Sequence, residues 1–397
     1  MVKQGSFDIP EVMPHESFSV KLDLSVTDAK AGVKYFINVH YFANNKKVHT
    51  KQFELGVLKK AEPFVPKAFE HTVSVDNYIL KVQGNDFSVQ FTKGMLSHFE
   101  KDGKLLIERP MSLNFWRAHT DNDGISIHSA RPLNVWKREM IRDYYFNLYD
   151  ISVEEKPESV TVTTVGRMTT DSVYGGFICK VIFEIYEGGN VLVSFRGEPY
   201  GALPENLPRI GVVFGIDKSF DSCSWIGRGP EENYSDSKLT APVGSYRLSV
   251  ENMNVIYDYP QETGNHENTT LASLESNDGR KLFVVGSDEF SFSYHDFSLD
   301  DLENALHKNE LKKSTDANYL YVDYKMRGLG SRSCGPDPEE KSELRPHSFE
   351  LSFILCGDEN VAKELSHLDF TRKTRALSDT YVATPTKRIP QLADCDI

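Results

Sequence analysis

Four segments of the sequence carry polar residues at spacings that could support chemistry. In chain order they are NFWRAHTDNDGI at 114–125, WIGRGPEENYSDSK at 225–238, YDYPQETGNHENTT at 257–270 and YKMRGLGSRSCGPDP at 324–338. The chemistry to weigh is cation binding for the first and glycosidic acid–base work for the second. For the third it is metal binding or proton transfer, and for the fourth it is phosphate binding or nucleophilic attack.

The first segment holds three oxygen donors in a row, Asp121, Asn122 and Asp123, followed by Gly124. A calcium loop needs a further ligand after the third donor and a downstream Glu, and its glycine stands later in the pattern. Asp and Asn residues before a glycine more often bond their own backbone in a turn. The sequence therefore favours a structural turn over a metal site.

The carboxylates of the second and third segments also favour plain structural interpretations. Retaining glycosidases need two carboxyl groups ~5–5.5 Å apart across the bond that breaks. Glu231 and Glu232 are adjacent, and adjacent side chains of an extended chain point to opposite faces, so a charged turn is favoured. His266 lies near Glu262 and Glu267 without a second His at ligand spacing, which favours a solvated polar loop.

The fourth segment is rich in glycine and follows the strand predicted over 319–326. Its glycines fit neither the dinucleotide-binding nor the phosphate-loop spacing, and no helix pattern comes after them. Cys334 has no His and carboxylate that the sequence places beside it, so a nucleophilic role is disfavoured. A polar loop on a rigid scaffold often carries binding function, and a turn that merely closes a hairpin is the alternative.

The elements that must position these segments are mostly strands. Val20, Leu22, Leu24 and Val26 alternate with polar residues, which is the period of a half-buried strand. A hairpin is predicted over 180–196, with EGGN as its turn, because two glycines supply positive φ. Further strands are predicted at 35–42, 87–93, 160–168, 209–216, 281–287, 290–295, 319–326 and 348–355.

Only two short helices are predicted. Ser298 and Asp301 form a capping box, with Leu299, Leu302 and Leu306 on one helix face. The second helix opens near Asp358. Strands do not alternate with helices, so the pattern excludes a (β/α)₈ barrel and predicts an all-β, antiparallel sandwich architecture. KKAEPFVPKAFEH at 59–71 is predicted to be a linker between two domains.

Composition narrows the class of protein further. The chain has 397 residues and a net charge of -13, which disfavours nucleic-acid binding. No apolar run approaches the ~20 residues that span a bilayer, and the first residues do not resemble a signal peptide. The 5 cysteines are widely spaced without a C-x-x-C pair, so a disulfide framework or a structural zinc is not expected. A cytoplasmic location is predicted.

The four segments, in this order, resemble the C-terminal region of β-galactosidases of glycoside hydrolase family 2. FWRAHTDNDGI resembles that family's F-x-R-A-x-x-D-N-D segment, and WIGRGPEENYSD resembles its G-x-G-P-x-E-N-Y-x-D segment. YPQETGNH resembles its P-Q-E-N-G-N loop, and GLGSRSCGP resembles its G-x-G-G/S-x-x-S/C segment. A weaker resemblance covers the whole chain.

The resemblance implies an incomplete immunoglobulin-like sandwich over 1–66. A large antiparallel supersandwich of the galactose-mutarotase-like type follows over 67–397. It implies retaining hydrolysis of terminal β-galactosides such as lactose. In the family, both catalytic glutamates and the magnesium ligands lie in a (β/α)₈ barrel. No catalytic residue and no metal ligand is therefore assigned to this chain, which we expect to be inactive alone and to partner a barrel chain that binds magnesium.

The resemblance also implies which residues meet the galactoside. The family's loop equivalent to Gly328–Gly335 reaches the mouth of the active site, and in many members it ends in a Trp. Gly335 stands at that position here, beside Cys334, so this sequence lacks the aromatic ring. The predicted substrate-binding residues are Arg332, Ser333, Cys334 and Gly335, with Arg332 and Ser333 as hydrogen-bond donors.

Two other functions stay open from the sequence. One is a stand-alone carbohydrate-binding protein or an aldose mutarotase, which would need a Glu base and a His acid facing one cleft. None of the 12 histidines is singled out by its spacing for that role. The other is an inactive, truncated relic.

Overall fold

The computed structural model describes residues 3–21, 26–76, 78–124, 131–331 and 337–370, together with the backbone of 387–388. The chain forms two compact units. The first comprises Met1–Pro63 with His367–Asp369, and the second comprises Phe64–Ser366 with Phe370–Ile397. The change of unit after Pro63 lies inside the segment predicted as a linker.

The first unit contains one long hairpin. Strand β1 (Lys34–Ala43) pairs antiparallel with β2 (Lys46–Val57), and the short strands β3 (Glu62–Pro63) and β21 (Leu368–Asp369) pair in parallel. The strand predicted over Val20–Val26 is not found in the described part of that segment, because Val20, Lys21 and Val26 lie outside any strand. Residues 22–25 lie outside the described residues.

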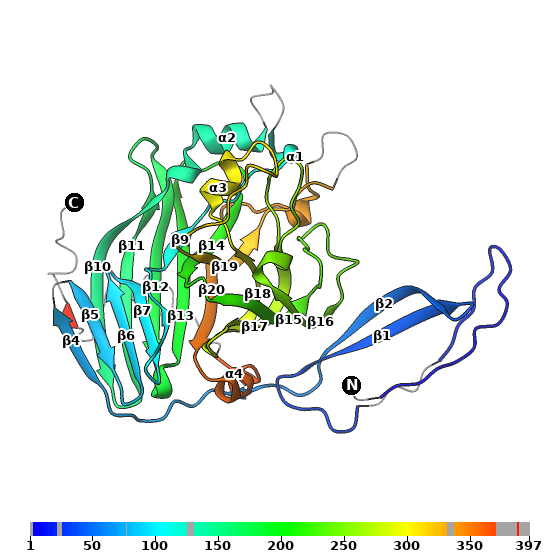
Figure 1. Cartoon of the computed structure of the whole chain (residues 1–397), viewed down its shortest axis with the longest axis horizontal. Helices are drawn as coiled ribbons and strands as arrows, with labels where there is room; N and C mark the ends of the chain where they lie inside the picture. Colours follow the sequence, from blue (N-terminus) through cyan, green and yellow to red (C-terminus); the bar gives the residue numbers. More distant parts are fainter. Residues whose placement is uncertain are drawn as a thin grey trace. The chain divides into compact units, whose positions relative to one another are not determined.

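The second unit is built on a five-stranded sheet and one much larger sheet. The small sheet runs in the order β4 (Thr72–Asp76), β5 (Ile79–Gln83), β6 (Phe87–Thr92), β7 (Met95–Lys101) and β8 (Lys104–Ile107). Figure 1 shows it beside one end of the large sheet. The ring of Phe91 on β6 lies 5.0 Å from that of Phe183 on the large sheet, so the two sheets share one core.

The large sheet is antiparallel and has thirteen strands within the described residues. Its main path begins β16 (Val243–Ser249), β15 (Phe220–Arg228), β17 (His266–Ser276), β18 (Lys281–His295) and β20 (Phe349–Cys356). The path continues through β13 (Val191–Gly201), β12 (Gly175–Ile185), β11 (Ser159–Thr169), β10 (Tyr145–Lys156) and β22 (Lys387–Arg388). Strand β19 (Asn318–Met326) pairs with β18 and β14 (Arg209–Ile216), which in turn pairs with β9 (Ser112–Asn114).

Most strand predictions are confirmed. Strand β14 has the bounds predicted for it, and the turn between β12 and β13 places Gly188 and Gly189 at φ 72° and 77°. The two strands predicted at 281–287 and 290–295 are one continuous strand, β18. The pairing of β17 with β18 has shifts of register, so β18 is one long strand with an irregular ladder. Alternation of side chains alone does not distinguish such a strand from two short ones.

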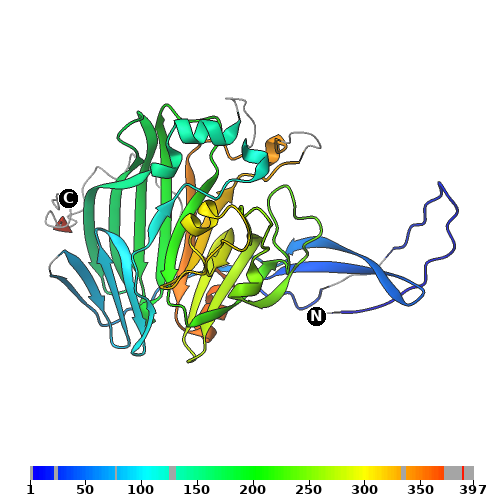
Figure 2. The same cartoon turned by 45° about the horizontal axis from the view of Figure 1, so that its top comes forward.

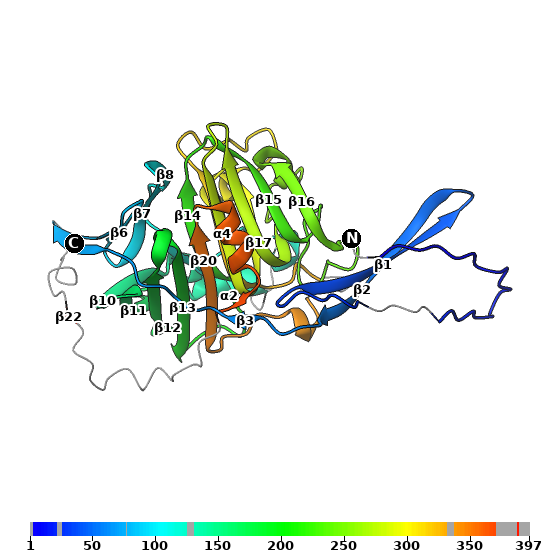
Figure 3. The ribbon, with the colours of Figure 1, turned by 90° about the horizontal axis from the view of Figure 1, so that it is seen from below.

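Four short helices complete the second unit: α1 (Asp121–Gly124), α2 (Pro132–Arg138), α3 (Leu299–Asn304) and α4 (Glu359–Leu365). Ser298 caps α3 in the predicted capping box, but the helix ends before Leu306, whose side chain is exposed. Helices α1 and α2 were not predicted. They lie at the same end of the large sheet (Figures 1 and 2), whereas α4 contacts β18 (Figure 3).

Candidate functional site

The fold brings all four polar segments into one hydrogen-bonded network. The first segment contacts the fourth through Arg117, whose Nη1 donates to the carbonyl of Arg327 at 2.6 Å. The second contacts the third through Glu232 and the fourth through Asp236. Gln261 of the third accepts a hydrogen bond from the backbone of Asp121 in the first. Segments more than 200 residues apart in the sequence therefore form one site.

An ion cluster whose Arg and Asp members are fully buried lies under this network. Asp123 accepts from Nη2 of Arg117 at 2.9 and 3.0 Å and from Nη1 of Arg327 at 3.3 Å. Arg327 forms a bidentate pair with Glu343, both bonds 2.8 Å long, and both guanidiniums lie 5.9 Å from the ring of Trp136. Asp123 is thus a structural ion-pair partner, and the turn predicted at 121–124 is a single helical turn.

A second buried cluster lies on the face of β14, β18 and β19. Arg209 donates to Asp323 at 2.8–2.9 Å and to Ser293 at 2.9 Å, and its guanidinium lies 4.5 Å from the ring of Tyr321. Glu262 approaches Arg209 to 4.0 Å from the third segment. Burial raises the pKa of Glu262 to about 7, opposed by the charges of Arg209 and Arg117.

The prediction of a solvated loop at 257–270 is therefore wrong at its centre. Glu262, Thr263, Asn265 and His266 are all at most 2% exposed. His266 lies against Trp225, with ring centroids 4.4 Å apart, and burial lowers the pKa of its ring to about 4. The segment is polar because it packs against other polar segments, a cause that its own sequence does not reveal.

The two adjacent glutamates of the second segment have different roles. Glu231 is exposed, whereas the carboxylate of Glu232 accepts hydrogen bonds from the hydroxyls of Tyr257 and Thr263 and from the backbone N–H of Gly264. Glu232 therefore ties the second segment to the third.

The predicted substrate-binding residues Arg332, Ser333, Cys334 and Gly335 lie outside the described residues. The structure does describe the approach to them, Gly328–Ser331, which is held by the first and second segments. Among the described residues, no group of three or more His, Cys, Asp or Glu side chains could hold a metal ion. Cys179, Cys223 and Cys356 are buried thiols.

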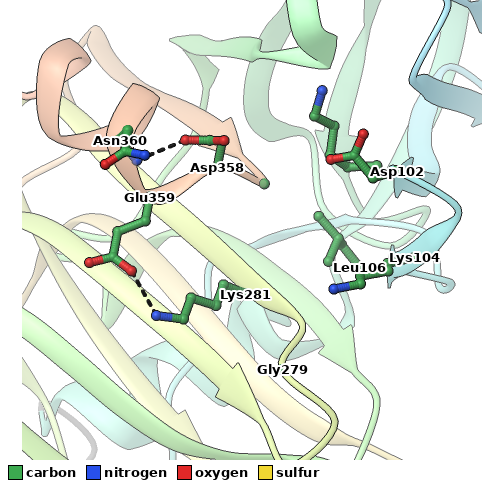
Figure 4. A pocket seen from close by; sticks show the side chains of 10 residues that line it. Asp102, Lys104, Leu106, Gly279, Lys281, Asp358, Glu359 and Asn360 are labelled. Carbon is green, nitrogen blue, oxygen red and sulfur yellow. Dashed lines mark hydrogen bonds and ion pairs between the residues drawn. The ribbon is translucent and has the colours of Figure 1, made fainter.

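A pocket of about 210 Å³ lies elsewhere in the second unit, between the β7–β8 turn and α4 (Figure 4). Two of its charged side chains pair with each other, since Lys281 lies 2.7 Å from Glu359, and Lys101 pairs with Asp86 outside the lining. The backbone N–H of Asn360 is bonded to Asp358. None of the four segments contributes to this pocket, so we do not assign it to the site.

One Glu–His combination beside Arg209 does not suit a mutarotase. Glu262 and His295 both lie near Arg209, but they are only 2% and 5% exposed. Burial lowers the pKa of His295 to about 3, so its ring is neutral and a poor source of protons. A sugar cannot reach a carboxyl and an imidazole that are enclosed by protein.

Sequence reasoning missed Arg209, Asp323 and Glu343 because each stands outside the four segments or at the end of a strand. Arg117, Asp123, Asp236 and Arg327 lie within the four segments, and the signal in the sequence is an Arg or Asp in three separate segments that contain glycine. Arg117 and Asp123 pair within one segment, six residues apart. The contacts of Arg117 with Arg327 and of Asp236 with Leu329 join residues about 100 to 200 positions apart, so predicting them needs the fold.

Comparison with known proteins gives the family. Residues 83–355 match the model of the family described as "Beta galactosidase small chain". A beta-galactosidase of Actinobacillus pleuropneumoniae is 28% identical over 362 residues, covering 88% of this chain and 34% of that protein. A beta-galactosidase of Staphylococcus xylosus is 31% identical over 256 residues, covering 64% of this chain and 25% of that protein.

The chain belongs to the beta-galactosidase small-chain family, and it spans about a third or less of the length of these relatives. Among solved structures, a galactose mutarotase related enzyme from Lactobacillus acidophilus is similar over 73% of this chain, with 12% identity and a TM-score of 0.38. Among the described residues, no helix is long and apolar enough to cross a membrane.

Proposed function

We propose that this chain is the part of a β-galactosidase that carries no catalytic carboxylate and completes the active site for terminal β-D-galactosides such as lactose. The observation that carries the proposal is the convergence of four polar segments into one network, in a chain that spans a third of proteins named beta-galactosidase. The catalytic glutamates and the magnesium site are assigned to a partner (β/α)₈ barrel.

The proposal is tested by mixing the purified chain with a barrel-containing β-galactosidase fragment that lacks this region. We expect hydrolysis of a chromogenic β-galactoside only in the mixture, because acid–base catalysis alone contributes about 10²–10⁴-fold and this chain supplies none. Hydrolysis by the chain alone, after host enzyme is removed, would contradict the assignment of both carboxylates to the partner.

The same samples test the alternative function. Anomer interconversion of galactose by the chain alone, followed by polarimetry, would support a mutarotase instead. Background rates in every sample, including mixtures whose association is shown by sedimentation, would support an inactive relic.

A further inference from the structure

A row of charged side chains crosses one face of the large sheet. Lys180 of β12 is paired in register with Arg196 of β13, and Arg196 is paired with Glu350 of β20. Directly paired residues point to the same face of a sheet. The neighbours of Lys180 along β12, Cys179 and Val181, point the other way and are fully buried in the core. The charged row therefore lies on the face that points away from the core.

Lys180 differs from the rest of this row because its charge has no partner. The residue is only 8% exposed. Its ammonium forms no hydrogen bond and no ion pair with any residue that the structure describes. Burial and the charge of Arg196 lower the pKa of Lys180. A buried ammonium without a counter-ion destabilises the folded protein, so an apolar residue would serve the fold better at this position.

Arg196, beside Lys180, is only partly satisfied. Its Nη2 donates to Oε1 of Glu350 at 3.0 Å, and its side chain is 13% exposed. Its Nε is buried and donates to none of the described residues. The hydroxyl of Ser352 donates to the same oxygen of Glu350 at 3.3 Å, so this carboxylate is already shared. Lys180 and Arg196 thus place two cations side by side with one carboxylate between them and the next strand.

The adjacent row on the same face adds one cation and one carboxylate. Arg167 of β11 and Glu198 of β13 are both paired with Ile178, whose side chain is 42% exposed. Each lies diagonally across from Lys180. The Arg167 guanidinium lies 5.0 Å from the ring of Tyr149, a cation–π contact that holds it on this face.

The charges next to Lys180 do not balance. Lys180, Arg196 and Arg167 are opposed by Glu350 and Glu198, which leaves one positive charge in excess. A further carboxylate of the face, Asp150, is paired with Val165 and lies two strands from Lys180, about 10 Å across the sheet. A ligand that neutralises the site therefore carries a single negative charge.

We propose that Lys180, with Arg196 and Arg167 beside it, forms a binding site for a small organic acid, whose carboxylate is the missing counter-ion. Hydroxyl groups of the same molecule can donate to Glu198, so these side chains suit a sugar acid. A phosphate dianion suits them less, because Glu198 and Glu350 repel its second charge. The site lies outside the four polar segments and needs no barrel chain, so it is independent of the proposed function.

Binding can be measured by calorimetric titration of the chain alone with galacturonate and galactose, which differ by a carboxylate at C6. We expect galacturonate to bind at least about tenfold more tightly, because its carboxylate gains charge-assisted hydrogen bonds. Lys180→Met removes the charge, keeps the length of the side chain and should lower the affinity for galacturonate at least about tenfold. Lys363→Met, at a side chain 63% exposed and paired with Glu359, is the control and should leave the affinity unchanged.

Unfolding in urea gives a second measurement on the same variants. Without ligand, Lys180→Met should have a higher urea midpoint than the wild type, because an apolar side chain replaces a buried, unpaired ammonium. Galacturonate should raise the midpoint of the wild type, since it binds the folded state, and should leave that of Lys180→Met unchanged.

Equal affinities for galacturonate and galactose, or equal affinities of the wild type and Lys180→Met for galacturonate, would overturn the site. A lower urea midpoint for Lys180→Met would show that the ammonium stabilises the fold, which contradicts its lack of a partner. Inorganic phosphate that binds more tightly than galacturonate would overturn the assignment to a sugar acid. None of these results depends on whether the chain completes a β-galactosidase.

Discussion

Glu262 is a buried carboxyl group whose Oε1 receives no hydrogen bond from any described residue. The charged and titratable groups that face it are Arg209, Arg117, Asp323, Glu232, Tyr234 and Tyr321. Its nearest cation, Nη1 of Arg209, is 4.0 Å away, beyond direct hydrogen-bond reach. Desolvation therefore outweighs the cations, and the folded state favours the protonated acid.

This imbalance predicts a specific pH dependence of stability. Folding raises the pKa of Glu262 from 4.5 to about 7, so the folded state is destabilised only at pH values where this side chain must ionise. Stability is therefore lost as pH rises through this window, by on the order of 3 kcal/mol at most. Glu262→Gln should remove that loss, so the variant should exceed the wild type in urea midpoint at pH 8 and match it near pH 4.

Glu251→Gln, at a side chain 71% exposed, serves as the control and should follow the wild type throughout. Parallel curves for wild type and Glu262→Gln from pH 4 to 8 would show that Glu262 keeps its charge in the folded protein at no cost.

At the scale of elements, the β1–β2 hairpin has two unlike faces. Tyr35, Ile37, Val39 and Tyr41 share one face with Phe53, which pairs with Ile37. The opposite face is mixed: Gln52 donates to Asn38 and His40 is bonded to Thr50, and Phe36 and Phe42 lie on the same face. A β-sandwich needs a second sheet packed on the apolar face of the first. An isolated two-stranded hairpin is only marginally stable in water.

We expect the missing half to come from the partner polypeptide. The amides of residues 34–57 should exchange rapidly in the lone chain and slowly in the reconstituted complex, because strands added to the apolar face would bury the hairpin. The strands of the β12–β13 hairpin in the second unit give an internal reference that should stay protected in both samples. Slow exchange at 34–57 in the lone chain would show that the first unit is already complete.

The strands could be predicted from the sequence because their pattern is local, whereas the site could not because it depends on contacts between distant residues. Alternation in RIGVVFGI or VTVTTVGRM reports local burial on a sheet, and it placed β14 and β11 within one residue at each end. Helix α2 was missed because PLNVWKR is too short to show a helical period. The burial of Glu262 and His266 depends on Arg209 and Trp225, which lie some 40 to 50 residues earlier in the chain, and no local pattern encodes that.

At the scale of the whole molecule, the large sheet is a support that gathers loops from distant parts of the sequence. Its strands bring residues 117, 236, 262 and 327 within one network, although they span more than half of the chain. Under the proposed function, the large sheet with its own core is the scaffold that holds these loops in place for a partner chain. It offers a rigid surface that a catalytic barrel can use.

The role of that surface at the substrate can be measured most directly with Arg332→Ala in the reconstituted enzyme. Arg332 is, with Ser333, one of the donors that the family resemblance implies for the sugar, and it follows Ser331, which Asp236 holds. We expect KM for lactose to rise about three- to tenfold while kcat and the affinity between the two chains stay unchanged. A KM and kcat equal to those of the wild type, in a mixture that still needs this chain for activity, would contradict the account and leave the chain as a scaffold for the barrel.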